Sequence, residues 1–174
     1  ALVLAPTREL AIQVSKVLAA LGRHRGVGVV PVYGGQSYEV QFRAFRAGAH
    51  VIVGTPGRLI DHITRGTIDL ANVGVAVLDE ADEMLDMGFF EDVESILKTL
   101  PGISTTATSD ANARGKVQVA LFSATMPTPV VRLAGRFMQD PAHVTVEATV
   151  ATVPRIAQVA YDLGRMDKTE ALGR

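Results

Sequence analysis

Residues 2–32 read LVLAPTRELAIQVSKVLAALGRHRGVGVVPV, and this stretch decides the fold. It begins with the apolar run Leu2–Leu4 and ends with the β-branched run Val27–Val32, both typical of buried strands. Between these runs, apolar side chains recur at helical spacing, at Leu10, Val14, Val17, Leu18 and Leu21. A strand, an amphipathic helix and a second strand form the unit that connects parallel strands.

The rest of the chain repeats this alternation. Further strands are predicted at Val51–Val53, Val75–Leu78, Val119–Phe122, Val144–Val146 and Val159–Tyr161. Shorter helices are predicted at about residues 37–47, 56–65, 90–99 and 128–138. Because continuous Val/Leu strands followed by helices favour a parallel sheet, the expected fold class is α/β. We expect a doubly wound parallel sheet with helices on both faces.

The composition excludes several classes of protein. The 174 residues, 48% of them apolar, suffice for one domain with a core. The chain has no cysteine, which excludes disulfide scaffolds and thiolate metal sites, and its four histidines lack zinc-ligand spacing. No apolar run approaches the roughly 20 residues of a membrane span, and no signal peptide opens the chain. We therefore expect a soluble, cytoplasmic protein.

Charge is distributed unevenly along the chain. Residues 1–78 carry eight Lys/Arg and four Asp/Glu, whereas residues 79–100 carry one Lys and eight acids. This asymmetry indicates two kinds of partner, one anionic and one cationic, such as a metal ion. A solvated acidic helix face is the alternative explanation for the second segment.

Two further features concern the organisation of the chain. Residues 102–117 are small and polar, so we expect a flexible surface loop there. The chain opens within a predicted strand and stops just after a predicted helix start. We therefore expect it to be a fragment of a longer protein.

Polar signatures follow five of the predicted strands. In a parallel sheet, ligands bind at the carboxyl ends of the strands, beside helix N-termini. The signatures are Pro6-Thr7-Arg8, Tyr33-Gly34-Gly35-Gln36, Gly54-Thr55-Pro56-Gly57-Arg58, Asp79-Glu80-Ala81-Asp82 and Ser123-Ala124-Thr125. Five such signatures on one edge of a sheet indicate a functional site.

Three of these signatures suit a run of phosphates. In Thr55-Pro56-Gly57-Arg58, a helix N-terminus with free N–H groups lies beside an arginine. Pro6-Thr7-Arg8 repeats the arrangement, and Gly34-Gly35 lets another backbone approach closely. Together they indicate a nucleic-acid strand held by its backbone. Ordinary helix capping is the alternative for each signature alone.

The other two signatures suit a nucleotide. Four apolar residues followed by Asp79 match the Walker-B arrangement, in which a buried strand presents a carboxylate to a phosphate-bound Mg²⁺. The adjacent Glu80 is placed to orient or deprotonate an attacking water. An acidic helix N-cap is the alternative, but Asp82 and the Ser123-Ala124-Thr125 strand end weaken it.

In this order, the five signatures resemble the motifs of the DEAD-box ATP-dependent RNA helicases. The resemblance extends over essentially the whole chain, and Val77–Phe89 and Phe122–Pro127 are especially similar to the family consensus. Residues 54–59 and 65–70 are most similar to the bacterial cold-shock branch, whereas the loop at 102–117 departs from it as an insertion. The resemblance implies a RecA-like version of the α/β fold.

The resemblance also implies roles for individual residues, with ATP and Mg²⁺ as cofactors and RNA as a partner. Asp79 would hold Mg²⁺ through water, and Glu80 would activate the hydrolytic water. Asp82 would bond toward Ser123 and Thr125, and so couple the nucleotide state to strand separation. The RNA backbone would lie along Pro6, Thr7, Arg8, Gly34, Gly35, Thr55, Pro56, Gly57 and Arg58. Contacts to phosphate and 2′-OH imply little sequence preference.

The sequence contains no Gly-x-x-x-x-Gly-Lys-[Ser/Thr] loop, which in the family precedes these motifs. The resemblance therefore implies a partial first RecA-like domain at 1–147, a linker at 148–155 and the start of a second RecA-like domain at 156–174. That second domain would be the partner of the first within the longer chain. The fragment alone would be inactive.

Two other functions fit parts of the sequence. An RNA-clamping module without catalysis is compatible with the missing phosphate loop, but it has no need of the Asp79-Glu80 pair. A DNA translocase of the wider helicase group is disfavoured by Thr-Pro-Gly-Arg and Asp-Glu-Ala-Asp occurring together.

Overall fold

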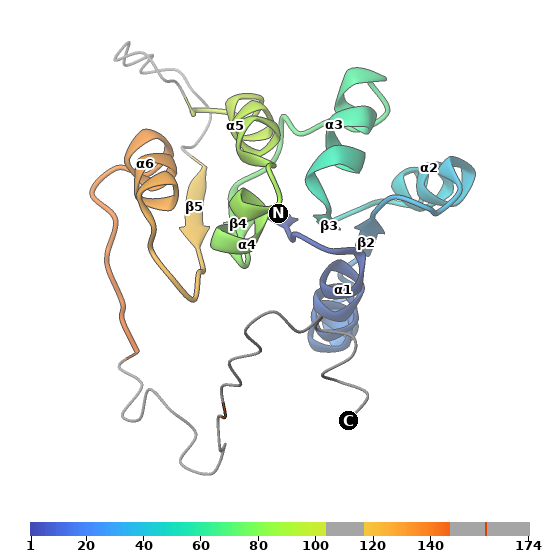
Figure 1. The fold of residues 1–174 in the computed structure, drawn as a ribbon. Coiled ribbons are helices and arrows are strands. Elements are labelled where there is room, and N and C mark those ends of the chain that lie inside the picture. The colour runs from blue at the N-terminus through green and yellow to red at the C-terminus, as the bar shows by residue number, and fades with distance from the viewer. Residues whose placement is uncertain (104–116, 147–158, 160–174) are drawn as a thin grey trace, which may run out of the picture. The chain divides into compact units, whose positions relative to one another are not determined.

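The computed structural model describes residues 1–103, 117–146 and Val159 (Figure 1). The chain divides into two units, residues 1–141 and 142–174, and the described helices and strands lie in the first. The strands are β1 (Leu2–Leu4), β2 (Val29–Val32), β3 (Val51–Gly54), β4 (Val75–Leu78) and β5 (Gln118–Leu121). The helices are α1 (Arg8–Gly22), the 3-10 turn η1 (Arg23–Arg25), α2 (Tyr38–Arg46), α3 (Pro56–Thr64), α4 (Ala81–Asp86), α5 (Phe90–Lys98) and α6 (Thr128–Phe137).

The strands form one sheet in the order β2-β3-β1-β4-β5, and every neighbouring pair is parallel. The register aligns their last residues. Leu4 lies opposite Gly54 and Leu78, Val32 lies opposite Gly54, and Leu78 lies opposite Leu121. The carboxyl ends of all five strands are therefore level at one edge of the sheet, which is where the polar signatures begin.

Apolar clusters cover both faces of the sheet. On one face, Val3 and Val53 pack with Ala11 of α1. On the other, Leu2 and Leu4 belong to a larger cluster that includes Leu59 of α3, Met84 of α4, Ile96 of α5 and Leu133 of α6. Successive residues of β1 thus face opposite clusters, as expected for a strand buried on both sides. The predicted α/β fold, a parallel sheet with helices on both faces, is confirmed.

Most predicted elements are present, with small differences at their ends. Leu2–Leu4 and Val75–Leu78 have the predicted bounds, while β2 begins at Val29 rather than Val27. The strand predicted at Val144–Val146 is wrong, because the described residues 142–146 form no strand. Val144 and Val146 are 89% and 90% exposed among the described residues, so none of these residues packs over this β-branched run. The short helix α4 was not among the predicted helices.

Several predictions lie outside the described residues. They concern residues 104–116 of the polar loop, the linker at 148–155, and the strand at Val159–Tyr161 apart from Val159, which belongs to no strand. The second-domain segment 156–174 is likewise undescribed except at Val159. Among the described helices, none is both long and apolar enough to cross a membrane.

Candidate functional site

The site lies along the level edge of strand ends, and its chemistry changes from one end of this edge to the other. The glycine and arginine signatures follow β2, β3 and β1, which are neighbours. We call these residues the basic half: Gly34, Gly35, Thr55, Pro56, Gly57, Arg58, Pro6, Thr7 and Arg8. The signatures after β4 and β5 form the acidic half: Asp79, Glu80, Asp82, Ser123 and Thr125.

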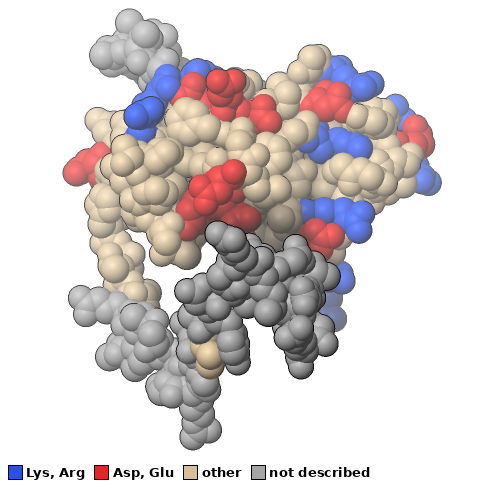
Figure 2. All heavy atoms as spheres, viewed as in Figure 1, with Lys and Arg blue, Asp and Glu red and all other residues tan. Residues whose placement is uncertain are grey.

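The two halves meet between β1 and β4. The chain leads from β1 to β2 on one side of this point, and from β4 to β5 on the other side. Such a switch point leaves a crevice at the strand ends, and ligands of open α/β sheets bind there. In Figure 2, acidic side chains gather over α4, and basic side chains lie toward α1, α2 and α3. One edge of the sheet therefore presents two chemically distinct surfaces side by side.

In the acidic half, the chain turns sharply at the end of β4. The Asp79 N–H donates to the Leu4 carbonyl at 3.0 Å, which extends the β1–β4 pairing to the first acid. Glu80 then takes a left-handed conformation, with φ 50° and ψ 55°, and α4 begins at Ala81. A left-handed conformation is costly for a residue other than glycine and tends to occur at functional sites. This turn places three acids, Asp79, Glu80 and Asp82, within four residues of a buried strand.

Asp82 joins the end of β4 to the end of β5. Its Oδ2 accepts from the Thr125 N–H at 2.8 Å and from the Thr125 hydroxyl at 2.7 Å. Its own N–H donates to the Ser123 Oγ at 3.1 Å. The Thr125 hydroxyl is the main cause that lowers the pKa of Asp82 to about 2, with help from Ser123 and from backbone N–H groups, against partial desolvation. The predicted contact of Asp82 with Ser123 and Thr125 is therefore present, and Asp82 is ionised at neutral pH.

The acidic half has the donors that a phosphate-bound Mg²⁺ requires. Mg²⁺ usually keeps several waters and is held by one or two carboxylates together with substrate phosphates. Among the described residues, no three His, Asp or Glu side chains are grouped closely enough to hold a metal ion by themselves. Asp79 is half-buried at the end of β4, beside the exposed Glu80. These residues fit a metal ion that arrives with its nucleotide and do not fit one that is permanently caged by protein.

In the basic half, two helices begin with Thr at the N-cap, but the two threonines are used differently. The Thr7 hydroxyl accepts from the Leu10 N–H at 3.3 Å and so caps α1. The Thr55 hydroxyl caps no backbone N–H among the described residues of α3. Pro56 occupies the first helical position, and apart from the neighbouring residues and backbone of α3 itself, no described atom lies within 4 Å of where a Cβ on Gly57 would be. The start of α3 is thus open to an approaching backbone or phosphate.

The glycine loop after β2 is bridged to the end of β1. Gly35 has φ +82°, which other residues adopt only at a cost. The Arg8 guanidinium lies 3.7 Å from where a Cβ on Gly35 would be, and 5.9 Å from the centre of the Tyr33 ring. Arg8 also forms an ion pair with Glu9 at 3.3 Å. Because β3 lies between β1 and β2, the Arg8 side chain reaches from the end of β1, past β3, to the loop that follows β2.

Arg58 is fixed by contacts with the same loop. Its Nη1 donates to the Gln36 carbonyl at 3.0 Å and to Gln41 Oε1 at 3.2 Å. Its guanidinium carbon lies 4.2 Å from the centre of the Tyr38 ring. Since a guanidinium carries five N–H donors, these contacts leave several of them for another acceptor. The structure therefore brings Arg58 and the Gly34–Gln36 loop together.

Two residues of this region were not singled out from the sequence. Gln41 and His62 are 1% and 0% exposed, and they contact each other beneath Arg58. The sequence does carry a signal for them, because each is a polar residue at a core-facing position of an amphipathic helix. Histidines were considered only for the spacing of zinc ligands, so this signal was missed.

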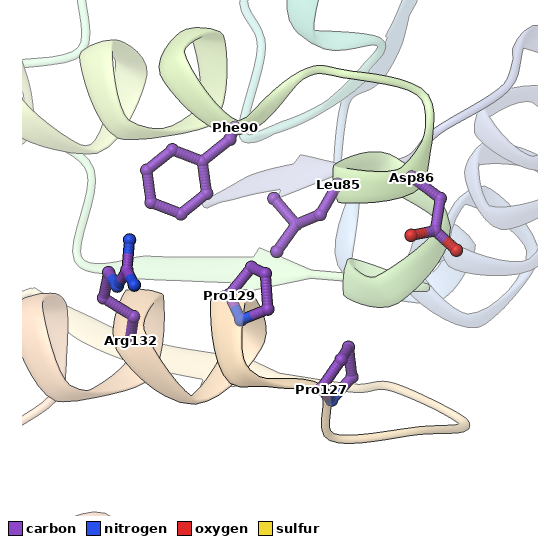
Figure 3. Close-up of a pocket in the computed structure, with 6 residues that line it drawn as sticks. All are labelled: Leu85, Asp86, Phe90, Pro127, Pro129 and Arg132. Atoms are coloured by element: carbon purple, nitrogen blue, oxygen red, sulfur yellow. The ribbon is translucent and has the colours of Figure 1, made fainter.

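A separate hollow of about 310 Å³ lies between α4, the start of α5 and α6 (Figure 3). Its lining is mostly apolar, with one acid and one arginine: Leu85, Asp86, Phe90, Pro127, Pro129 and Arg132. None of these six is a predicted site residue. The predicted site residues lie at the strand ends and do not line this hollow.

The chain is similar in sequence to known proteins. A family model described as DEAD/DEAH box helicase matches residues 1–133. The ATP-dependent RNA helicase DeaD of Escherichia coli strain K12 is 51% identical over 99% of this chain and 26% of that protein. The DEAD-box ATP-dependent RNA helicase CshA of Geobacillus kaustophilus is 51% identical over 100% of this chain and 34% of that protein. This chain thus spans between a quarter and about a third of the length of these curated relatives.

Solved structures share the fold. A DEAD box protein from the hyperthermophile Methanococcus jannaschii has a TM-score of 0.69 and 43% identity, over 80% of this chain and 34% of that one. The yeast DEAD-box splicing factor Prp28 has a TM-score of 0.70 and 34% identity, over 79% of this chain and 30% of that one. These comparisons confirm the resemblance that the five signatures indicated.

Proposed function

We propose that this chain, which belongs to the DEAD/DEAH box helicase family, forms part of an ATP-dependent RNA helicase. The acidic half acts on ATP, and the basic half grips the RNA backbone. One observation carries this proposal: five level strand ends present the two chemistries next to each other on one edge. The names of DeaD and CshA, both 51% identical to this chain, support it.

In the acidic half, Asp79 would hold the Mg²⁺ of the bound nucleotide, and Glu80 would orient the attacking water and accept its proton. Mg²⁺–ATP, when bound, supplies the phosphoryl group that is transferred to water. The left-handed Glu80 supports this assignment, because local strain next to a carboxylate at a strand end is a feature of functional sites. The phosphate-cradling loop that hydrolysis also requires is absent from this sequence.

In the basic half, the open start of α3 and the two arginines hold successive phosphates of one RNA strand. Three neighbouring strand ends span roughly 10 Å, since adjacent strands lie about 4.8 Å apart. The residues involved are Pro6, Thr7, Arg8, Gly34, Gly35, Thr55, Pro56, Gly57 and Arg58. Contacts to the backbone alone leave the RNA sequence unread, so unwinding has little sequence preference.

Asp82 couples the two ligands. It lies two residues after Glu80 in the sequence, and it bonds to both Ser123 and Thr125. A shift of the Glu80 turn on nucleotide binding is therefore passed to the Ser123–Thr125 loop. Through that loop, the nucleotide state controls local separation of an RNA duplex.

The organisation of the whole protein is part of the proposal. Residues 1–147 form a partial first RecA-like domain, 148–155 a linker, and 156–174 the start of a second RecA-like domain, the partner of the first in the longer chain. The relatives, three to four times longer than this chain, support this division. We place the protein in the cytoplasm. The chain has no cysteine, so its folding does not depend on disulfide formation in an oxidising compartment.

The test is ATP hydrolysis by the full-length protein, measured with and without RNAs of unrelated sequence. We expect RNA to stimulate hydrolysis whatever its sequence. Glu80→Gln keeps the shape and removes the base, so turnover should fall by roughly 10²–10⁴-fold while ATP and RNA still bind. Turnover near that of the wild type would contradict the assignment of Glu80, and a non-catalytic RNA clamp would then be the better account.

A further inference from the structure

The basic half rests on a buried polar pair that joins α2 to α3. These two helices follow β2 and β3, the strands whose ends carry the glycine loop and Arg58 (Figure 1). Gln41 of α2 and His62 of α3 are almost completely buried, and His62 Nε2 lies 2.7 Å from Gln41 Oε1. Burying two polar side chains between helices is costly unless their hydrogen bonds are made. A pair of apolar side chains would join the helices without that cost.

The remaining hydrogen bonds of Gln41 all go to the proposed RNA-binding region. Its Nε2 donates to the Tyr33 carbonyl at 3.1 Å and to Gln36 Oε1 at 2.9 Å. Its Oε1 accepts from Arg58 Nη1 at 3.2 Å. One side chain therefore holds both ends of the glycine loop and the arginine of α3.

The direction of these bonds determines the protonation of His62. Because both amide hydrogens of Gln41 are used on oxygen atoms, its Oε1 faces His62 and can only accept. A neutral His62 then carries its proton on Nε2, and its Nδ1 faces the Thr67 hydroxyl at 2.8 Å, whose one hydrogen is also within reach of the His62 carbonyl at 3.1 Å. Burial is the main cause that lowers the pKa of His62, and Arg58 and Arg65 add to it against Asp61. The neutral imidazole is the form that the site holds.

Aromatic rings keep the imidazole in place. The ring centres of Tyr38, Phe42 and Phe45 lie 5.5, 5.7 and 5.1 Å from that of His62, each near edge-to-face. Tyr38 also contacts two guanidinium groups, with Arg58 at 4.2 Å and Arg65 at 4.7 Å from its ring centre. The same ring thus packs on the buried imidazole and on the arginine at the surface.

We propose that Gln41 and His62 are positioning residues that hold the Gly34–Gln36 loop and Arg58 in the geometry that grips RNA. His62 acts through Gln41, and Gln41 acts on the loop and on Arg58, so neither residue touches RNA. This inference rests on the proposed function of the basic half. Preorganisation of this kind lowers the cost of binding, because the loop is already ordered before RNA arrives.

The experiment compares substitutions at His62 in the full-length protein. His62→Leu removes the donor to Gln41, and His62→Gln keeps an N–H donor at a similar reach. We expect His62→Leu to raise the KM for RNA in the ATPase assay about tenfold, with kcat at saturating RNA changed less than about twofold. In His62→Gln, the KM for RNA should stay close to the wild-type value. Val93→Ala, at a fully buried position of α5 outside this network, controls for a general loss of stability and should leave the KM unchanged.

A second variant and a measurement on the wild type keep the inference testable if His62→Leu does not fold. Gln41→Glu is nearly isosteric, but its oxygens cannot donate to Tyr33 and Gln36, so the KM for RNA should again rise about tenfold. In the wild type, the ring ¹⁵N chemical shifts of His62 should report the neutral Nε2–H form at pH 7.

An unchanged KM in both His62→Leu and Gln41→Glu, a KM raised equally in Val93→Ala, or an Nδ1–H imidazole would each overturn the positioning role. These outcomes differ from a failure of the proposed function. In that case the wild type itself would show no ATP hydrolysis that depends on RNA.

Discussion

The basic and acidic halves of the strand-end edge are held in place by different means. The acidic half is built around one backbone turn, in which Glu80 is left-handed, and Asp82 just after it accepts short hydrogen bonds from Thr125, 43 residues further along the chain. The basic half is built by arginine side chains that join the loops after three strands, because Arg58 donates to Gln36 and Gln41, and Arg8 reaches Gly35. A metal-bound nucleotide requires a few fixed carboxylates, whereas an RNA backbone requires an open surface spread over several loops. The difference in construction therefore matches the difference in ligand.

The largest effect is expected from removing charge in the acidic half. Asp79→Asn takes away the negative charge beside the proposed metal ion, so Mg²⁺–ATP should bind about 10- to 100-fold more weakly. RNA affinity measured without nucleotide should not change. Asp86→Asn, at the other end of α4, is the matched control. Titration calorimetry of each variant with Mg²⁺–ATP checks this, and equal losses in the two variants would show that only the overall acidity matters.

A smaller effect is expected in the basic half. Arg58→Ala should weaken RNA binding about tenfold, about 1.4 kcal/mol, for every RNA sequence tested. The slope of log K against log salt should fall by about 0.7, since one phosphate contact is lost. Arg23→Ala, at the opposite end of α1 from the site, should change neither. Fluorescence anisotropy at several salt concentrations measures both quantities, and a variant that binds normally but loses a sequence preference would contradict backbone recognition.

The smallest effect concerns the contact between Asp82 and Thr125 within the acidic half. Thr125→Val removes the hydroxyl that is the main cause of the low pKa of Asp82, so this pKa should rise from about 2 toward 3.8. Because the folded-state pKa lies below the unfolded value, the contact stabilises the wild type above pH about 4. That stabilisation is lost as the pH falls toward 2. NMR titration of the Asp82 carboxyl checks the shift, and an unchanged pKa in Thr125→Val would exclude the hydroxyl as its cause.

The sequence predicted the sheet well, and it predicted that the polar signatures follow the strand ends, because both depend on short local patterns. A parallel strand buried on both faces needs a continuous apolar run, and Val75–Leu78 is such a run followed directly by Asp79. The same reasoning fails at Val144–Val146, where the pattern is present but no described residue covers it. A β-branched run indicates a strand only when a partner strand is at hand.

Other features could not be read from local patterns. The helix α4 begins after a left-handed Glu80, which is not a typical N-cap residue conformation. The acidic residues of this segment are also typical of a solvent-exposed surface, so the sequence did not indicate where the helix starts. Gln41 and His62 lie 21 positions apart, and their pairing depends on how α2 and α3 pack. A polar residue on an apolar helix face indicates that it has a buried hydrogen-bond partner, but the sequence does not identify the residue that is this partner.

Hydrogen exchange of the full-length protein tests the central claim, that one edge binds two ligands in separate halves. The protein is measured free, with RNA alone, and with Mg²⁺ and a non-hydrolysable ATP analogue alone. RNA should slow exchange in residues 33–37 and 55–59 and leave residues 79–85 unchanged, while the nucleotide should do the reverse. Protection of residues 79–85 by RNA alone, or of both regions equally by either ligand, would contradict the division of the edge into two halves.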